Sequence, residues 1–277
     1  MKLVLVLAAA WILVTALLVL NQRRLVYFPP RDYPVLPPAL GLPWEPARLS
    51  ASDGVPLAAW FIPAPREGSP VVLFFHGNAT CLSGTLEHAA AIRDLGFAFA
   101  AVDYRGYGES GGRPTEEGLA RDARAALEWL DLRGVPRSRL LLYGHSLGAA
   151  VAARLAAGLG AGKGVAGLVL EGSFTGVLAM ARYHYPWAMV PGIFLLDKHE
   201  TAVHAARAAC PVLVLHGGRD DIAPPAMGRA VFDALAQRPG NRFHSVPAGG
   251  HNDVLLRDPG ASGAFAEFAA SCLEGAR

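Results

Sequence analysis

The chain has 277 residues, 52% of them hydrophobic, and its 25 basic residues almost balance its 23 acidic ones, for a formal net charge of +2. Because the basic residues are spread along the whole length without forming a stripe, the sequence argues against nucleic acid as a partner. This length accommodates one large α/β domain or two small ones. The three cysteines, Cys81, Cys210 and Cys272, are too widely separated for a metal-binding motif, so we predict that they are buried thiols.

The first predicted element is an apolar run over residues 3–20 that only Thr15 interrupts, with Arg23 and Arg24 shortly after it. At about 1.5 Å per residue, a helix over this run would be roughly 27 Å long, close to the ~30 Å of a bilayer's hydrocarbon core. A cleaved signal peptide is the alternative, although its apolar centre is usually shorter. We predict a single membrane anchor over residues 1–24 and leave its orientation open, because positive charge flanks both ends.

Residues 25–46 are rich in proline and aromatic side chains. Because proline fits neither a helix interior nor a central strand, we predict an extended tether that packs on the domain surface. Two strands over residues 47–52 and 56–62 follow, separated by Asp53 and Gly54. An Asp-Gly pair between two such runs is a strong signal for a β-hairpin.

Short apolar runs then alternate with segments of helical periodicity for the rest of the chain. The apolar runs predict buried strands over residues 71–75, 97–102, 140–143, 167–171 and 211–215, and we predict a last strand over residues 242–246. This alternation is typical of an α/β protein with a mostly parallel sheet, covered by helices on both faces and here given an antiparallel start. No break in composition divides the stretch, so we predict one catalytic domain over residues 47–277.

The strand at 140–143 ends abruptly in the sequence GHSLG of residues 144–148, and an alanine-rich helical pattern begins at once. Buried strand, sharp turn and helix are the context of the G-x-S-x-G nucleophile elbow. Glycine has no Cβ, so Gly144 and Gly148 allow the turn to tighten and the helix to pack closely beneath it. Ser146 is then predicted to be a nucleophile on a strained turn. A plain Gly-Ser turn between two core elements is the alternative.

Functional side chains of such a sheet gather at the carboxyl ends of its strands, where Ser146 is joined by a candidate base and a candidate acid. His251 follows the last strand in a glycine-rich loop, and an imidazole is the natural base for a serine hydroxyl near neutral pH. Asp220, at the turn after the preceding strand, is the predicted acid that orients His251. Glu171 and Asp221 remain alternatives for that role.

Acyl transfer also needs hydrogen-bond donors aimed at the developing oxyanion. The backbone N–H of Leu147, at the helix start, is one predicted donor, and the N–H of Asn78, after the strand at 71–75, is the other. The stretch from His76 to Ala79 also fits a plain strand-to-helix turn with Asn78 near the helix cap. Both interpretations can hold together, because a capping turn presents such an amide.

Together these motifs resemble the α/β-hydrolases of the branch related to serine aminopeptidases and prolyl oligopeptidases, including membrane-anchored lysophospholipases and protein depalmitoylases. Five stretches within residues 45–275 carry the resemblance, namely 76–78, 103–108, 144–148, 216–220 and 250–253. The resemblance implies an α/β-hydrolase fold, with Ser146, Asp220 and His251, in that chain order, as the catalytic residues. It is much less specific for substrate, because esterases, thioesterases, lipases and peptidases share these motifs.

The chain departs from many such relatives after the strand at 167–171, where they insert a large lid. Here only about residues 174–208 separate two strands, and they include the aromatic residues Tyr183, Tyr185 and Trp187. We interpret this segment as a short cap, with a packing helix that exposes a few aromatic residues as the alternative. An apolar cap and a membrane anchor both favour a lipid-like substrate.

The sequence therefore predicts a membrane-anchored serine hydrolase that cleaves carboxylic esters or thioesters of lipid-like or acyl substrates. The reaction would proceed through an acyl-enzyme on Ser146 and would use neither a cofactor nor a metal. A serine peptidase or aminopeptidase on the same residues is the first alternative. A catalytically silent, membrane-tethered binding protein is the second, but that reading usually requires the loss of a catalytic residue, and none is missing here.

Overall fold

The computed structural model describes residues 2–160, 164–187, 192–235 and 238–275. In these residues one sheet contains the strands β1 (Glu45–Ser50), β2 (Pro56–Ile62), β3 (Val71–Phe75), β4 (Ala98–Val102), β5 (Leu140–His145), β6 (Gly167–Glu171), β7 (Val212–Gly217) and β8 (Arg242–Val246). The strands lie in the order β1-β2-β4-β3-β5-β6-β7-β8. β2 pairs antiparallel with both β1 and β4, and the remaining pairs are parallel.

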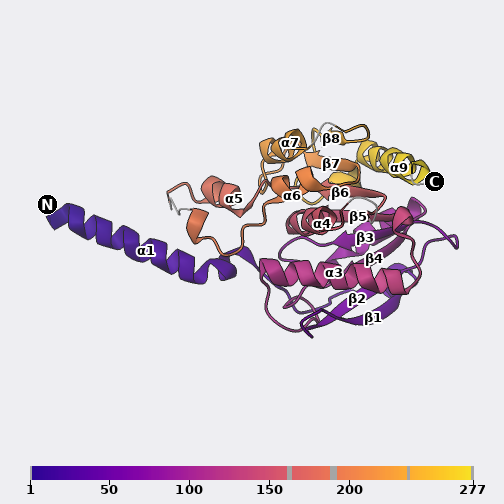
Figure 1. The fold of residues 1–277 in the computed structure, drawn as a ribbon, viewed down its shortest axis with the longest axis horizontal. Helices are drawn as coiled ribbons and strands as arrows, with labels where there is room; N and C mark the ends of the chain where they lie inside the picture. The colour runs from indigo at the N-terminus through magenta and orange to yellow at the C-terminus, as the bar shows by residue number, and fades with distance from the viewer. Residues whose placement is uncertain (1, 161–163, 188–191, 236–237, 276–277) are drawn as a thin grey trace.

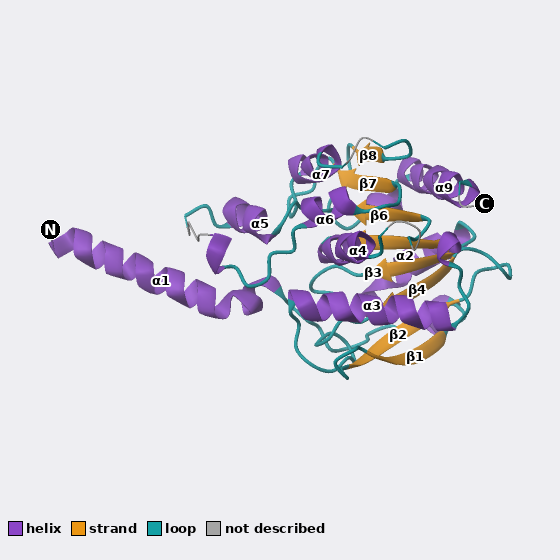
Figure 2. Cartoon of the chain, viewed as in Figure 1, coloured by secondary structure: helices purple, strands orange, loops and turns teal. Residues whose placement is uncertain are grey.

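The helices in the described part of the chain are α1 (Lys2–Val26), α2 (Leu86–Asp94), α3 (Glu116–Leu132), α4 (Leu147–Gly158), α5 (Val177–His184), α6 (Thr201–Arg207), α7 (Pro225–Asp233), α8 (Val254–Arg257) and α9 (Pro259–Glu274). Apart from α1 and α5, they cover both faces of the sheet (Figure 2). One face packs against α3, α4, α6 and α7, and the other packs against α2, α8 and α9. In Figure 1, α1 extends away from this α/β body, and α5 lies on the side from which α1 leaves.

The two buried faces of the sheet follow from the alternation of side chains along each strand. In β3, Val71, Leu73 and Phe75 contribute to one core layer, whereas Val72 and Phe74 contribute to the other. A strand buried on both faces reads as an unbroken apolar run, which is why the sequence predicts these strands. Because β3, β5, β6 and β7 are parallel, their carboxyl ends lie along one edge of the sheet.

The predicted α/β architecture, with a mostly parallel sheet and an antiparallel start, is confirmed, and the three cysteines are buried free thiols. Several boundaries differ from the prediction by one or two residues, and two of these differences have a clear cause. α1 continues to Val26, because the N–H of Tyr27 still bonds the carbonyl oxygen of Arg23 and completes a further turn. β1 begins two residues early, at Glu45, because that residue pairs with Phe61 of β2.

The segment between α1 and β1 lies on the domain surface, where the guanidinium of Arg31 donates to the carbonyl oxygens of Gly108 and Ser110 at 3.2 and 2.7 Å. It contains one 3-10 turn, Pro37–Leu40, which the prediction of an extended tether did not include. Proline is preorganised for the first turn of a helix, and Gly41, with φ 67°, ends this one.

Among the described residues, α1 is the helix that is long and apolar enough to cross a membrane, and it lies near the N-terminus, where a signal sequence would meet the same criterion. Its apolar side chains are exposed along most of its length. The predicted cap over residues 174–208 contains α5, the 3-10 turn Gly192–Phe194 and α6, while its residues 188–191 lie outside the described residues.

Candidate active site

The turn between β5 and α4 holds Ser146 at φ 53° and ψ −115°, a conformation that L-residues rarely adopt. Two glycines make this turn possible. A Cβ on Gly144 would overlap the carbonyl oxygen of Gly148, and a Cβ on Gly148 would overlap the carbonyl oxygen of Phe75. The strand, tight turn and helix that the sequence predicts around Ser146 are therefore present, and they hold the serine at the carboxyl edge of the sheet.

The hydroxyl of Ser146 is hydrogen-bonded to a histidine and, through it, to a carboxylate. Ser146 Oγ lies 2.9 Å from Nε2 of His251, and Nδ1 of the same ring lies 2.7 Å from Oδ2 of Asp220. His251 and Asp220 are buried, whereas Ser146 is partly exposed. An imidazole bound in this way can accept the serine proton while the carboxylate stabilises the imidazolium that forms.

The carboxylate of Asp220 is held by more than His251. Its Oδ1 accepts hydrogen bonds from the N–H groups of Ile222 and Ala223 at 3.0 and 2.8 Å, and Nε2 of His216 lies 3.3 Å from its Oδ2. Burial alone would raise the pKa of Asp220, but the interactions with His216 and His251 outweigh burial and hold this pKa well below its usual range. Asp220 is therefore ionised at neutral pH.

In the described structure, neither alternative acid is bonded to His251. Glu171 is fully buried at the end of β6, where its Oε2 accepts a hydrogen bond from the hydroxyl of Tyr143 at 2.7 Å and lies 3.3 Å from Nε2 of His88. Burial opposes ionisation of Glu171, but the interactions with His88 and Tyr143 lower its pKa to about 2. Asp221 is exposed at the surface.

The loop after β3 lies directly against the serine turn. A Cβ built on Gly77 would lie 3.5 Å from the Cβ of Ser146, so Asn78 follows a residue that borders the serine. Within the described residues, the backbone N–H of Asn78 donates to no acceptor. Leu147 is the first residue of α4, where N–H groups lack an acceptor in the helix. One predicted oxyanion donor, Leu147, therefore directly follows Ser146, and the other, Asn78, follows a residue that borders the serine.

The side chain of Asn78 makes contacts that the sequence does not predict. Its Nδ2 donates to the carbonyl oxygen of Val26 at 2.6 Å, and its Oδ1 accepts from the N–H of Phe28 at 3.0 Å and from the hydroxyl of Tyr107 at 2.8 Å. The loop after β3 is thus bonded to the last residue of α1. The placement of Asn78 near a helix cap is wrong, because the next helical turn begins only at Leu82.

His145, inside the serine turn, supports the loop that carries the second histidine. Its Nε2 donates to the carbonyl oxygen of His251 at 2.9 Å. Burial lowers the pKa of His145 to about 4, so its ring is neutral near pH 7. Gly172 lies close to the same loop, since a Cβ there would lie 3.2 Å from the His251 ring. No sequence pattern signals these contacts, because the partners are far apart in the chain.

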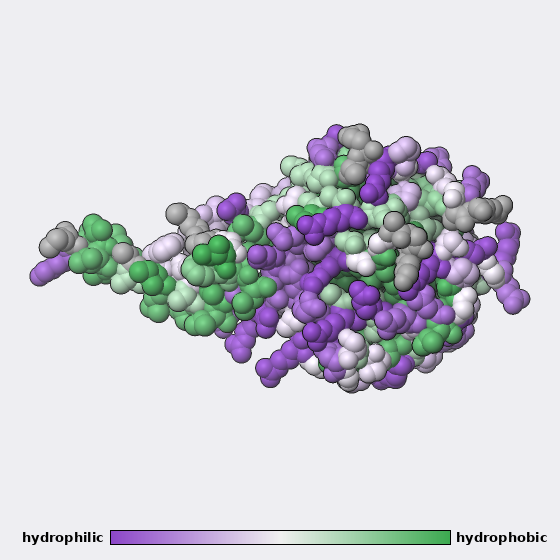
Figure 3. Space-filling model, in the orientation of Figure 1, coloured by the Kyte–Doolittle hydropathy of each residue, from purple (hydrophilic) through white to green (hydrophobic). Residues whose placement is uncertain are grey.

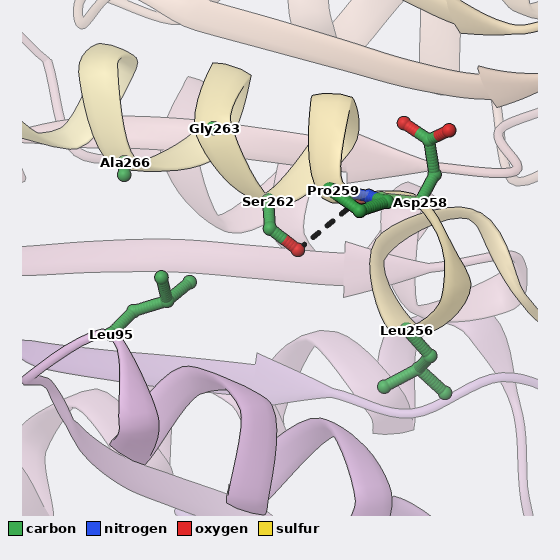
Figure 4. A pocket seen from close by; sticks show the side chains of 7 residues that line it. All are labelled: Leu95, Leu256, Asp258, Pro259, Ser262, Gly263 and Ala266. Atoms are coloured by element: carbon green, nitrogen blue, oxygen red, sulfur yellow. Dashed lines mark hydrogen bonds between the residues drawn. The ribbon is translucent and has the colours of Figure 1, made fainter.

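A separate surface pocket of about 480 Å³ opens between α8, α9 and the end of α2 (Figure 4). None of the predicted site residues lines this pocket, and its lining residues are Leu95, Leu256, Asp258, Pro259, Ser262, Gly263 and Ala266. Among the described residues, no three His, Cys, Asp or Glu side chains are grouped so as to hold a metal ion.

The sheet topology and the strand-turn-helix unit around Ser146 define an α/β-hydrolase fold. A solved structure, the esterase Pf2001 of Pyrococcus furiosus, matches 90% of this chain and 98% of its own with a TM-score of 0.72. The two sequences are 19% identical, so this likeness concerns the fold.

Comparisons of sequence identify the family. The model of the family "Serine aminopeptidase, S33" matches residues 66–190. The protein Rv2307c of Mycobacterium tuberculosis is 40% identical over 245 residues, which cover 86% of this chain and 83% of that protein. The α/β hydrolase domain-containing protein WAV2 of Arabidopsis thaliana is 36% identical over 262 residues, which cover 87% of this chain and 84% of WAV2. The chain therefore belongs to the α/β-hydrolase family.

A further relative has an activity in its name. The lysophosphatidylserine lipase ABHD12 of Danio rerio is 33% identical over 205 residues, which cover 68% of this chain. The match covers 53% of ABHD12, so this chain corresponds to about half of that protein.

Proposed function

We propose that this protein is a serine hydrolase that cleaves carboxylic esters or thioesters of lipid-like acyl substrates. The observation that carries the proposal is the hydrogen-bonded chain from Ser146 through His251 to the ionised Asp220, with distances of 2.9 and 2.7 Å. In this proposal Ser146 is the nucleophile, His251 is the general base and acid, and Asp220 orients His251 and stabilises its charged form.

The reaction proceeds in two halves. Ser146 Oγ attacks the carbonyl carbon of the substrate while Nε2 of His251 takes the hydroxyl proton. The N–H groups of Asn78 and Leu147 hold the negative charge that develops on the carbonyl oxygen, and removal of one such donor typically costs ~2.7–4 kcal/mol. His251 then protonates the leaving alcohol or thiol, which leaves an acyl-enzyme on Ser146. Water hydrolyses that ester with His251 again acting as the base.

A lipid-like substrate is supported by the relative ABHD12, which is named as a lysophosphatidylserine lipase. It is also supported by the long apolar helix α1 and by the exposed aromatic side chains of Tyr183 in α5 and of Tyr185 and Trp187 just after it. We propose that residues 1–24 anchor the chain in a membrane through residues 3–20 and that residues 25–46 form a tether. Residues 47–277 then form the catalytic domain, with a short cap at 174–208.

Peptide cleavage on the same residues is the second candidate, because the matching family model is named after serine aminopeptidases. An aminopeptidase would need an acidic group to bind the amino terminus of its substrate. Three buried carboxylates at or after the carboxyl ends of strands already have partners: Asp103 bonds the N–H of Leu82, Glu171 bonds Tyr143, and Asp220 bonds His251. This arrangement favours uncharged acyl groups over free amino termini.

A fluorophosphonate probe tests the nucleophile, because it reacts covalently with activated serines. We expect the wild-type chain to be labelled and the Ser146→Ala variant to remain unlabelled. Ser262→Ala provides a matched control, because Ser262 lies beside the surface pocket of Figure 4 and should not affect labelling. Absence of labelling in the wild type, or equal labelling of Ser146→Ala, would refute the proposal and favour a non-catalytic binding protein.

The substrate class is tested by hydrolysis rates for acyl esters of increasing chain length, with matched thioesters and aminoacyl amides measured in parallel. We expect kcat/KM to rise with acyl chain length and the amides to be poor substrates. Faster turnover of aminoacyl amides than of any ester would instead assign the site to the peptidase candidate.

A further inference from the structure

Six large apolar side chains remain exposed on one end of the molecule. They belong to α5, the residues just after it, and the 3-10 turn Gly192–Phe194 with its continuation, and their exposed fractions range from 48% to 83%. We call them the apolar collar: Tyr183, Tyr185, Trp187, Ile193, Phe194 and Leu196. The two segments that carry the collar lie close together, because a Cβ on Gly192 would lie 2.8 Å from the side chain of Leu178 in α5.

The collar is bonded directly to the end of α1. The side-chain amide of Gln22 donates to the carbonyl oxygen of Phe194 at 3.1 Å and accepts from the N–H of Leu196 at 2.7 Å. The next residue, Arg23, forms an ion pair with Asp197 at 2.8 Å. Gln22 is buried by these contacts, so the collar and α1 form one continuous unit.

These bonds set the depth of the collar relative to α1. The apolar run of α1 ends at Leu20, and Gln22 lies about 3 Å farther along the helix axis, given a rise of 1.5 Å per residue. If α1 spans a membrane, the residues bonded to Gln22 lie where the hydrocarbon meets the lipid head groups. Figure 3 shows that the hydrophobic surface of α1 continues onto this end of the α/β body.

The composition of the collar fits that depth. Tyrosine and tryptophan are enriched at the boundary between hydrocarbon and head groups, because each ring has an apolar body and a polar edge. α5 itself has no buried residue. Val177 and Met180 pack on the domain, whereas the ring contacts of Tyr183 and Tyr185 in the described structure are with His184 and Trp187 of the same segment. A contiguous apolar patch of this kind on a soluble surface marks a contact with something else.

We propose that the apolar collar inserts into the interfacial layer of the lipid bilayer that α1 spans, and that it holds the catalytic domain against that surface. The inference rests on the proposed membrane anchor, and it adds a second membrane contact within the catalytic domain. An acyl substrate would then reach the cap from the bilayer without first crossing water.

An environment-sensitive nitrobenzoxadiazole label on single introduced cysteines tests the placement in the full-length chain, reconstituted in phosphatidylcholine vesicles. Ile193→Cys reports on the collar, and Leu13→Cys reports on α1. Leu132→Cys is the matched control, because Leu132 is an apolar residue with 88% exposure. It lies at the far end of α3, about 24 Å from the start of that helix beside Asp197. The native cysteines are buried, so the unmodified chain serves as the labelling blank.

We expect the labels at positions 13 and 193 to be blue-shifted and quenched by brominated lipids, and the label at position 132 to be unaffected. A quenched label at 13 with an unquenched label at 193 would overturn the collar inference and leave the anchor intact. Unquenched labels at both positions would overturn the anchor as well. A shift at 193 that follows the protein-to-lipid ratio would assign the collar to contacts between two copies of the chain and refute the inference.

Hydrolysis rates supply a second readout. Ile193→Glu should lower the hydrolysis of a long-chain ester embedded in vesicles by about tenfold, since a charge replaces an apolar side chain at the interface. Its rate on a water-soluble short-chain ester should match the wild type, and Leu132→Glu should change neither rate. Equal losses on both esters would place Ile193 in the active site and overturn the inference. Failure of the wild type on every ester would refute the proposed function, while the label data would remain valid.

Discussion

The serine turn and the apolar collar differ in how far their side chains are partnered within the protein. At the serine turn, buried ionisable groups are bonded by the protein itself, as Asp220 is by His251 and by two backbone N–H groups. In the collar, large apolar side chains such as Trp187 and Ile193 are exposed and have few protein neighbours. The groups of the first region are bonded within the protein, whereas we propose that those of the second are covered by lipid. Substitutions in the two regions should therefore be detected by different measurements.

The largest effect that we expect is a loss of kcat when a bond at the serine turn is removed. Asp220→Asn keeps the size of the side chain but favours the wrong tautomer of His251, and the equivalent change in a serine protease lowers kcat by about 10⁴-fold. We expect a loss of that order for soluble and membrane-borne esters alike. Asp221→Asn is the neighbouring control and should leave kcat unchanged, because Asp221 is exposed. A larger loss from Glu171→Gln than from Asp220→Asn would show that the acid is misassigned.

A second prediction concerns the packing beneath the serine. Gly148→Ala would push a methyl group into the carbonyl oxygen of Phe75, and such overpacking costs about 3 kcal/mol of unfolding free energy. Urea unfolding in mild detergent measures this cost. Gly158→Ala, at the other end of α4, is the matched control, because its added Cβ meets only the end of the Arg124 side chain at 3.5 Å. Equal stability of the two variants would contradict the tight turn.

Lowering the pH should reduce the unfolding free energy, because buried histidines of the serine turn and of the loop after β3 are neutral in the folded chain. Burial lowers the pKa of His145 from 6.5 to about 4, so between these values only the unfolded chain takes up that proton. The unfolding free energy therefore falls as the pH falls through this window, by about 1.4 kcal/mol per pH unit for each such group. His76, with its pKa lowered to about 4 by burial, acts in the same direction. Asp103, with its pKa raised to about 6 by burial, opposes them.

Denaturant titrations at several pH values test this account. His145→Asn should flatten the dependence between about pH 6.5 and pH 4, because one proton uptake is removed. His244→Asn is the control, since His244 is only partly buried and should leave the slope as it is. An unchanged slope in His145→Asn would mean that its ring is not neutral in the folded chain.

The smallest predicted effect concerns Asn78, which links the loop after β3 to the end of α1. Asn78→Ala keeps the backbone N–H that we assign to the oxyanion but removes the side-chain bonds to Val26, Phe28 and Tyr107. We expect kcat to fall by about tenfold, the equivalent of ~1.4 kcal/mol, with little change in KM, because loosened donors act mainly in the transition state. Tyr107→Phe removes only one of these bonds and should have a smaller effect. A change confined to KM would contradict the positioning role of the Asn78 side chain.

The sequence is most informative where backbone packing sets the pattern. The strands appear as apolar runs because parallel strands are buried on both faces, and the serine turn appears because Gly144 and Gly148 leave no room for a Cβ. Choosing between Asp220 and Glu171 as the acid is harder from sequence alone, because both lie at or after the carboxyl ends of neighbouring strands. Alternation along β6 puts Glu171 on the face of Val169, beneath the sheet edge and beside Tyr143, while Asp220 lies in a loop that reaches His251.

Side-chain bonds between distant segments leave no such pattern. Gln22 meets Leu196, and Asn78 meets Val26, although each residue looks ordinary in its own stretch of sequence. No periodicity encodes a hydrogen bond whose partners are brought together only by the whole fold. The link between α1 and the loop after β3 therefore had to come from the structure.

That link has a consequence for how the protein would respond to proteolysis. A protease that cut just before Tyr27 would remove the Val26 carbonyl that holds Asn78, and with it the Gln22 bonds to the cap. The released domain would keep Ser146 and its histidine but would lose a support for the oxyanion loop. If α1 anchors the chain in a membrane, a soluble copy released in this way would therefore be slower than the anchored one, by no more than the roughly tenfold expected for Asn78→Ala, because Phe28 and Tyr107 still bond Asn78.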